Sequence, residues 1–225
     1  MLRKWEDFPE KMKNEYVYEY YIILSKKKIS LFLKRIFDVI FSFLLLIVLS
    51  PVFIIISILI KLDSSGPVFF RQVRITQYGE EFRIFKFRTM YHNKVGSSVT
   101  VKNDNRVTPV GKYIRKYRLD EICQLIDILR GTMTFVGTRP EVPQYVSHYD
   151  DEMLATLLLP AGVTSQASIE FKDEEKLLEG VRNIDEVYVN EILPQKMKYN
   201  LNAIKEFSVF LELKIMLLTI KKVFL

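Results

Sequence analysis

The sequence has little of what several common enzyme classes require. It contains one cysteine, Cys123, and two histidines, His92 and His148, which lie far apart. A single cysteine excludes an intramolecular disulfide framework and is compatible with a reducing compartment. The two histidines lack the spacing of metal ligands, and no Ser–His–Asp, P-loop or Rossmann pattern is present. We therefore assign no role to either histidine and expect Cys123, beside the apolar face of a predicted helix, to be inert.

Charge is absent from residues 39 to 60, which read VIFSFLLLIVLSPVFIIISILI. As a helix this run is about 33 Å long, enough to cross a hydrocarbon core of about 30 Å. It is not a cleavable signal peptide, because a polar, charged segment of about thirty residues precedes it and no small-residue cleavage site follows. The run predicts insertion into a membrane.

Two features of this run bear on whether it spans the membrane. Ser50-Pro51 stands at its middle, where proline removes a helical hydrogen bond and favours a kink. Cations also flank the run on both sides: Lys26, Lys27, Lys28, Lys34 and Arg35 before it, and Lys61, Arg71 and Arg74 after it. A spanning helix places its cations mainly on the cytoplasmic side. The pattern favours a bent, re-entrant helix, although a kinked helix that spans remains an alternative.

Asp38 lies just before the apolar run, one turn after Lys34 and Arg35. At the membrane interface it could pair with Arg35, three residues away on the same helix face. Lys34 and Arg35 could meanwhile contact lipid phosphates. An ordinary interfacial cluster of charges would have the same composition.

The remaining composition is that of one modest globular domain. The chain has 225 residues, a net charge of +6 and 49% hydrophobic residues, a fraction that the uncharged run inflates. The positive charge suits an anionic membrane surface or phosphorylated ligands. No nucleic-acid-binding motif or folded basic module supports the competing explanation, so no nucleic-acid partner is predicted.

The other segments can be placed coarsely. Residues 1 to 30 form an aromatic, charged arm with a short helix near residues 8 to 24, and residues 67 to 90 form a β-hairpin turning at residues 77 to 80. Cations alternate with aromatics along this hairpin, as on a solvated strand face or an anion-binding one. A polar loop over 91 to 105 and a helix over 107 to 118 follow. Residues 207 to 225 suit an interfacial helix or, alternatively, a helix packed against the core.

The most informative stretch is residues 119 to 141, LDEICQLIDILRGTMTFVGTRPE. The acid pair Asp120-Glu121 opens a predicted helix, where the helix dipole favours negative charge, and Gly131 ends that helix. Arg139 follows in a turn-like segment. Two carboxylates and a guanidinium so close in sequence suit a site that handles a phosphate and a metal ion together. Acids in a first helical turn also occur for capping reasons alone.

With these pieces in place, the chain closely resembles the bacterial sugar transferase family of monotopic phosphoglycosyl transferases. The resemblance covers residues 30 to 223, and its motifs occur in order and at the family spacing. They are KRIFD at 34 to 38, Ser50-Pro51, GPVFFRQ at 66 to 72, FKFRTM at 85 to 90, LDE at 119 to 121, QL at 124 and 125, VG at 136 and 137, RPE at 139 to 141, and LKIM at 213 to 216.

The resemblance implies transfer of a sugar-1-phosphate from a UDP-sugar to polyprenyl (undecaprenyl) phosphate with release of UMP, the first membrane step of bacterial glycan assembly. It implies Asp120 as the nucleophile that forms a covalent sugar-phosphate intermediate. Glu121 would hold Mg²⁺ or act as a base, Arg139 would bind phosphate, and Arg88 would make a phosphate or structural contact. An ionised Asp120 at a helix N-terminus would be kept deprotonated.

The resemblance also implies the architecture and the partners. The expected fold is α+β, with an N-terminal arm (1 to 30), a re-entrant, kinked membrane helix (31 to 62) and a small, mostly helical catalytic domain (63 to 225) with a short β-hairpin and interfacial amphipathic helices. Ser50-Pro51 would break the membrane helix, with the domain facing the cytoplasm at the bacterial inner membrane. The expected partners are the UDP-sugar, polyprenyl phosphate and inner-membrane lipid, and a homodimer is left open.

Some residues depart from the family pattern. Ile122 and Cys123 replace a common Leu-Pro, Thr138 replaces the proline before Arg139, and Thr132 replaces a common acid. Residues 160 to 165, PAGVTS, replace a common Pro-Gly-Ile-Thr-Gly segment and are a candidate source of donor selectivity. Two alternatives to the transferase stay open: a catalytically silent membrane scaffold, and an enzyme of different phosphoryl-transfer chemistry.

Overall fold

The computed structural model describes residues 2–91, 105–172, 174–177, 181 and 183–224. Its α-helices are α1 (Glu15–Ser25), α2 (Lys28–Asp63), α3 (Pro109–Lys116), α4 (Gln124–Arg130), α5 (Pro143–Val146), α6 (Gln166–Glu170), α7 (Glu174–Leu177), α8 (Ile184–Val187), α9 (Leu193–Lys205) and α10 (Val209–Phe224). Its strands are β1 (Phe69–Ile75), β2 (Glu81–Phe87), β3 (Met133–Val136) and β4 (Ala161–Thr164). Short 3-10 turns lie at Trp5–Asp7, Glu10–Met12, Gln77–Gly79, Leu119–Cys123 and Met153–Leu158. Most of the predicted polar loop, residues 92 to 104, lies outside the described residues.

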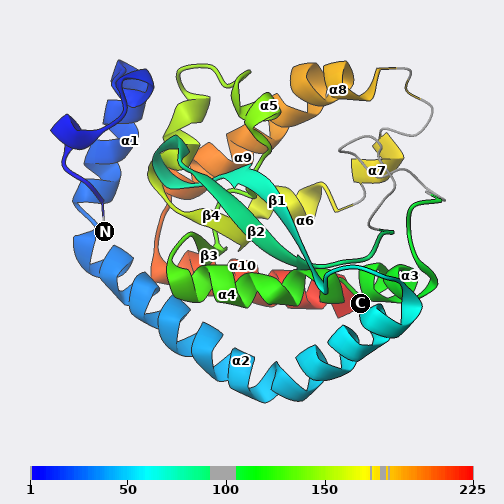
Figure 1. Cartoon of the computed structure of the whole chain (residues 1–225). Helices are drawn as coiled ribbons and strands as arrows, with labels where there is room; N and C mark the ends of the chain where they lie inside the picture. Colours follow the sequence, from blue (N-terminus) through cyan, green and yellow to red (C-terminus); the bar gives the residue numbers. More distant parts are fainter. Residues whose placement is uncertain (1, 92–104, 173, 178–180, 182, 225) are drawn as a thin grey trace.

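The long helix α2 lies beneath the rest of the molecule (Figure 1). It starts beside α1, passes under α4 and ends near α3, changing direction along the way. Pro51 stands inside this continuous helix, where it removes one backbone hydrogen bond. In the described part of the chain, α2 is the one helix long and apolar enough to cross a membrane, with a mean hydropathy of 3.2 over its most apolar window. Whether it enters and leaves by one face stays a prediction.

The side chains of α2 show which parts of it face the domain. The buried ones fall one turn apart, Lys34, Asp38 and Ser42 in the first half and Ile56 and Ile60 in the second. Ile56 and Ile60 pack with Phe87 and Ile114. The other face is apolar and exposed; Val48, for example, is 70% exposed and Leu62 80%. A helix whose outer face, turned away from the domain, consists of exposed aliphatic residues needs an apolar environment.

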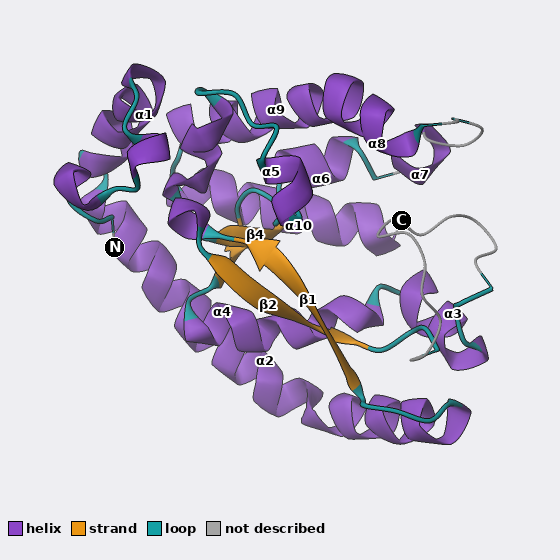
Figure 2. Cartoon of the chain, turned by 45° about the horizontal axis from the view of Figure 1, so that its top comes forward, coloured by secondary structure: helices purple, strands orange, loops and turns teal. Residues whose placement is uncertain are grey.

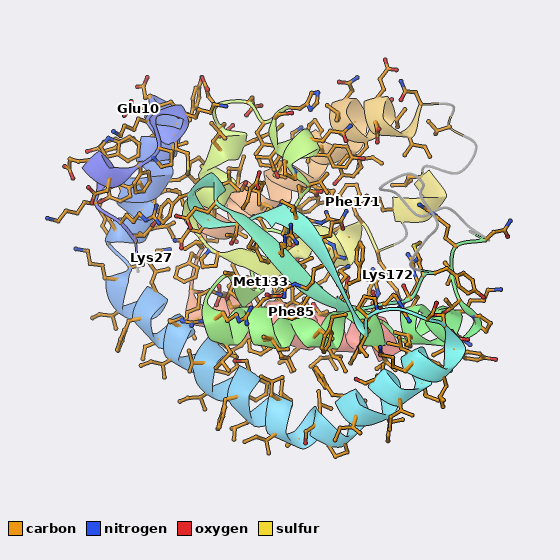
Figure 3. The ribbon with its side chains drawn as sticks, viewed as in Figure 1. Glu10, Lys27, Phe85, Met133, Phe171 and Lys172 are labelled. Carbon is orange, nitrogen blue, oxygen red and sulfur yellow. The ribbon has the colours of Figure 1, made fainter. Side chains whose placement is uncertain are left out.

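The predicted β-hairpin is confirmed. Strands β1 and β2 pair antiparallel, from Phe69 opposite Phe87 to Ile75 opposite Glu81. The turn between them holds Tyr78 and Gly79 at positive φ, 60° and 76°. The hairpin lies across α4 (Figure 2). Phe82 and Ile84 of β2 pack on Leu125 of α4 and on Met133, which Figure 3 labels.

A second, parallel pair of strands was not predicted. Strands β3 and β4 pair in register, with Met133 opposite Ala161 and Val136 opposite Thr164. Residues 160 to 165, the candidate segment for donor selectivity, therefore form mainly a packed strand. Beside this pair the backbones of Gly137 and Gly162 approach so closely that a Cβ on Gly162 would lie 2.2 Å from Gly137 N. Only glycine fits this crossing.

The N-terminal arm is part of the core. Its helix α1, predicted near residues 8 to 24, starts at Glu15, where Asn14 caps it by accepting from Val17 N over 2.8 Å. Val17, Tyr20 and Leu24 are buried against Leu158 and Leu201. The arm thus braces the side of the domain formed by α9.

The C-terminal helix α10 has two different faces. Ile215 is buried against Val136 and Ile169, so the packing alternative holds for this face. Phe210 and Leu217 on the outer face are 79% and 67% exposed. This outer face is the part to which the interfacial prediction still applies.

Candidate active site

The acid pair Asp120-Glu121 lies in a 3-10 turn, Leu119–Cys123, directly before α4. The sequence predicted it within the first helical turn. Arg118 adopts a left-handed conformation with φ 53°, which sets the tight entry to the turn. The end of the helix is as predicted, because Gly131 stands after Arg130 with φ 91°. Cys123 in this turn is fully buried, and burial raises the pKa of its thiol, consistent with an inert residue.

Glu121 is held by two cations from different parts of the fold. Arg139 Nη2 donates to Glu121 Oε1 over 2.5 Å, and Lys86 Nζ donates to the same oxygen over 3.1 Å. Burial alone would raise the pKa of Glu121, but the charges of Arg139 and Lys86 outweigh it and hold that pKa well below its usual range. The carboxylate of Glu121 is therefore ionised at all physiological pH values. The predicted proximity of Glu121 and Arg139 is confirmed.

Asp120 has a different environment. Among the described residues its carboxylate makes no side-chain hydrogen bond or ion pair of its own. Burial, together with the neighbouring charge of Glu121, raises the pKa of Asp120 above its ordinary value, against the attraction of Lys86 and Arg115. This direction is opposite to the sequence expectation of a carboxylate kept ionised by a helix N-terminus, because burial and Glu121 dominate. The α-helix itself starts four residues later, at Gln124. The site thus contains one clamped carboxylate beside one uncommitted carboxylate.

The hairpin contributes cations that the sequence could not separate from a solvated strand face. Lys86 of β2 contacts Glu121 directly. Arg74 of β1 donates to Pro140 O over 3.1 Å and to Gln72 Oε1 over 2.8 Å, next to the Arg139 segment. Arg71 instead lies over the ring of Phe85, 3.4 Å from its centroid. Only some of the alternating cations therefore reach the acid pair.

Arg88 lies at the end of α2. Its guanidinium donates to Ser65 O over 2.8 Å and to Ser64 O over 2.7 Å, and the residue is 4% exposed. The sequence left open a phosphate contact or a structural contact for Arg88, and the structure shows the structural contact. Its side chain closes the C-terminal end of α2.

Glu141, two residues after Arg139, belongs to a buried polar network. It accepts from Tyr188 Oη over 2.6 Å, and Lys196 Nζ lies 3.3 Å from the same oxygen. Lys196 also contacts Glu174 Oε2 at 3.1 Å. Burial by itself would raise the pKa of Glu141, but Lys196 and the Tyr188 hydrogen bond outweigh it and lower that pKa. Sequence reasoning missed Tyr188 and Lys196, since no local motif marks residues so far from 139 to 141.

The charged residues at the start of α2 do not behave as predicted. Asp38 does not pair with Arg35: it accepts from Thr134 Oγ1 over 2.6 Å and from Phe135 N over 3.3 Å. Arg35 donates to the last carbonyls of α4, Ile128 O at 2.7 Å and Leu129 O at 3.0 Å.

Lys34 also points into the protein. It pairs with Glu212 at 2.6 Å and donates to Val136 O at 2.9 Å. The expected contacts of Lys34 and Arg35 with lipid phosphates are replaced by contacts within the protein, because α2 packs this face on β3, α4 and α10. Ser50 donates to Ile47 O of its own helix over 2.7 Å.

The donor set is compatible in kind with Mg²⁺. Asp120 and Glu121 offer carboxylate oxygens, and Mg²⁺ is commonly held by one or two carboxylates together with substrate phosphates. Within the described residues, no group of three or more His, Cys, Asp or Glu side chains is placed to hold a metal by itself. A metal here would thus depend on the oxygens of a bound phosphate.

Fold and site together show a chain with one helix long and apolar enough to cross a membrane, among the described residues, and an acid pair beside the cations Arg139 and Lys86. The sequence profile described as bacterial sugar transferase matches residues 29–225. The chain belongs to the bacterial sugar transferase family.

Curated relatives agree with this membership. An undecaprenyl-phosphate glucose phosphotransferase of Komagataeibacter xylinus is 35% identical over 84% of this chain and 35% of its own length. A UDP-glucose:undecaprenyl-phosphate glucose-1-phosphate transferase of Klebsiella pneumoniae is 36% identical over 88% of this chain and 41% of its own. A UDP-N-acetylgalactosamine-undecaprenyl-phosphate N-acetylgalactosaminephosphotransferase of Aeromonas hydrophila is 32% identical over 85% of this chain and 44% of its own. The chain therefore spans less than half the length of these relatives.

Proposed function

We propose that this chain transfers a sugar-1-phosphate from a UDP-sugar to polyprenyl phosphate and releases UMP. The single observation that supports this best is the pairing of an uncommitted Asp120 with a clamped Glu121 beside Arg139 and Lys86. The names of the relatives support the donor and acceptor classes. If cations held both carboxylates, the pair could serve a structural role alone. Here Arg139 and Lys86 hold Glu121, and the carboxylate of Asp120 remains available to act as a nucleophile.

In the proposed reaction a carboxylate oxygen of Asp120 attacks the β-phosphorus of the donor. The bond from this phosphorus to the bridging oxygen breaks, and UMP leaves with the bonding electron pair. A phosphate oxygen of the polyprenyl phosphate then attacks the same phosphorus and releases the carboxylate of Asp120. A covalent intermediate lets a soluble donor and a lipid acceptor use one site in turn.

The cations have a physical role in both steps. Attack on a diphosphate by a carboxylate brings anions together, so positive charge must offset their repulsion. Arg139 and Lys86 would hold phosphate oxygens while Glu121 keeps the two cations at the acid pair. Glu121 would help to hold Mg²⁺, which when bound would supply further charge stabilisation.

The membrane arrangement is part of the proposal. We infer that α2 enters and leaves the bilayer on the cytoplasmic side of the inner membrane, bending near Ser50-Pro51, so that the site lies at headgroup level. The cations on both sides of the uncharged run, residues 39 to 60, support this over a spanning helix. Tags at both termini should be labelled by a membrane-impermeant reagent only after the membrane is broken. An N-terminal tag labelled on intact cells would show that the helix spans.

UMP release by purified protein in nanodiscs tests the activity. The assay contains Mg²⁺, undecaprenyl phosphate and a panel that includes UDP-glucose and UDP-N-acetylgalactosamine. We expect release from one donor that Asp120→Asn abolishes, whereas Asp151→Asn, at an exposed acid, retains it. Intact-protein mass spectrometry without acceptor should show a sugar-phosphate adduct on the wild type and on Asp151→Asn but not on Asp120→Asn. Folded protein that releases no UMP from any donor would favour the scaffold alternative.

A further inference from the structure

A buried polar network begins two residues after Arg139, one of the two cations that bind Glu121. It consists of Glu141, Tyr188 and Lys196, which are 6%, 5% and 5% exposed. Tyr188 Oη donates to Glu141 Oε1 over 2.6 Å, and Lys196 Nζ donates to Tyr188 Oη over 2.8 Å. Groups this deeply buried must satisfy one another, so the three side chains have little freedom to move separately.

The network reaches the active site through the backbone of residues 139 to 141. Glu141 O accepts from Ile75 N over 3.0 Å, and Pro140 O accepts from the guanidinium of Arg74 over 3.1 Å. Strand β1 therefore holds this segment from one side, and the network holds the Glu141 side chain from the other. Arg139 lies two residues before Glu141, whose carboxylate the network holds. The direction in which the Arg139 side chain points toward Glu121 therefore depends on the contacts with β1 and on the network.

The backbone that presents Tyr188 is unusual. Tyr188–Ile192 forms a π-helical turn between α8 and α9. Such turns insert an extra residue into a helix and occur frequently at functional sites. Here the turn starts at the tyrosine that contacts Glu141.

The geometry points to Glu141, Tyr188 and Lys196 as positioning residues that fix Arg139 for binding the donor diphosphate. This inference rests on the proposed function, because Arg139 is taken to bind phosphate. Stability alone is a poor explanation of the network, since a buried ion pair contributes little compared with apolar residues of the same volume. A guanidinium that must meet a diphosphate in a fixed direction does need such support.

The chain offers a closely matched control. Tyr145 packs on Tyr188 with ring centroids 4.5 Å apart, and its hydroxyl donates to Asp185 over 2.6 Å. Tyr145→Phe and Tyr188→Phe therefore each remove one hydroxyl from the same aromatic pair. In the part of the chain that the structure describes, the hydroxyl of Tyr188 bonds to the Glu141 carboxylate, two residues after Arg139, whereas that of Tyr145 bonds to Asp185.

The experiment compares these variants by two measurements. The first is kcat/KM for UMP release, and the second is binding of inorganic pyrophosphate with Mg²⁺, which does not depend on turnover. We expect Tyr188→Phe to lower both by roughly tenfold and Tyr145→Phe to change either by less than about twofold. Glu141→Gln, which preserves shape, should act as Tyr188→Phe does and serves in its place if that variant does not fold.

A double variant separates positioning from general destabilisation. If Tyr188 acts through Arg139, then Tyr188→Phe should cost little more when Arg139→Lys is already present. Equal losses in the two tyrosine variants, or full additivity with Arg139→Lys, would overturn the inference. A wild-type protein that binds pyrophosphate but releases no UMP would contradict the proposed function alone.

Discussion

Replacement of Asp38 tests how α2 is attached to the catalytic domain. Its carboxylate, 3% exposed, accepts from Thr134 Oγ1 at 2.6 Å and from Phe135 N at 3.3 Å. A hydrogen bond to a charged group contributes about 1.5–3 kcal/mol, so Asp38→Ala should lower the free energy of unfolding by roughly 3–6 kcal/mol. Asp38→Asn keeps one acceptor oxygen and should cost about half as much.

Thermal unfolding in detergent measures this loss. For a chain of this size each kcal/mol lowers Tm by about 2–4 °C, so Asp38→Ala should lower Tm by at least roughly 6 °C. Ser42→Ala is the matched control, because Ser42 is buried one turn further along the same face but bonds only to Val39 O of its own helix. We expect Ser42→Ala to cost less than about 1 kcal/mol.

The same variant links the anchor to the site. Asp38 bonds to β3, and β3 leads within three residues from Val136 to Arg139. UMP release should therefore fall in Asp38→Ala even at temperatures where the protein is folded. Equal Tm values for Asp38→Ala and Ser42→Ala would refute the reasoning, since they would mean that the bonds to Thr134 and Phe135 contribute nothing.

Three further predictions follow from the contacts of the site and of α2. Because burial and Glu121 raise the pKa of Asp120 above its ordinary value, activity should fall as the pH decreases through that raised pKa. Lys86→Met removes a positive charge that lowers the pKa of Asp120, so the acid limb of the kcat/KM profile should move to higher pH. A shift of that limb to lower pH would contradict the assignment of Asp120. Arg35→Met removes the two bonds to the last turn of α4 and should destabilise the protein by about 1–3 kcal/mol, less than Asp38→Ala because Arg35 is only partly buried. Thermal unfolding measures this loss, and an unchanged Tm would show that this end of α4 needs no cap. Chelation by EDTA should stop UMP release and added Mg²⁺ should restore it, whereas full activity in EDTA would exclude the metal role of Glu121.

Elements with strong local signals were predictable from the sequence. The long uncharged run, the hairpin around Gly79 and the helix end at Gly131 each depend on the chemistry of a few adjacent residues. The proximity of Glu121 and Arg139 was also predictable, because the two residues belong to one short segment, residues 119 to 141. Such features need no knowledge of distant parts of the chain.

Features that depend on tertiary packing were not predictable in this way. Strands β3 and β4 have four residues each, and their pairing brings Gly137 and Gly162 so close that only glycine fits, which no local pattern reveals. The inward direction of Lys34 and Asp38 did leave a signal: with Ser42 they form a polar stripe at four-residue spacing on one face of an apolar helix. A polar stripe on a membrane helix indicates contact with protein rather than lipid.

The contacts of α2 make this long apolar helix part of the framework that holds the candidate site. In its first half Lys34 and Asp38 hold β3, which leads to Arg139. At its far end the carbonyls of Ser64 and Ser65 are held by Arg88, two residues after Lys86. The two cations that bind Glu121 are thus each only a few residues from a bond to α2, at opposite ends of the helix. With α2 placed in the bilayer as proposed, we expect a change in its path to alter the spacing of Arg139 and Lys86, and so to couple the lipid environment to the geometry of the acid pair.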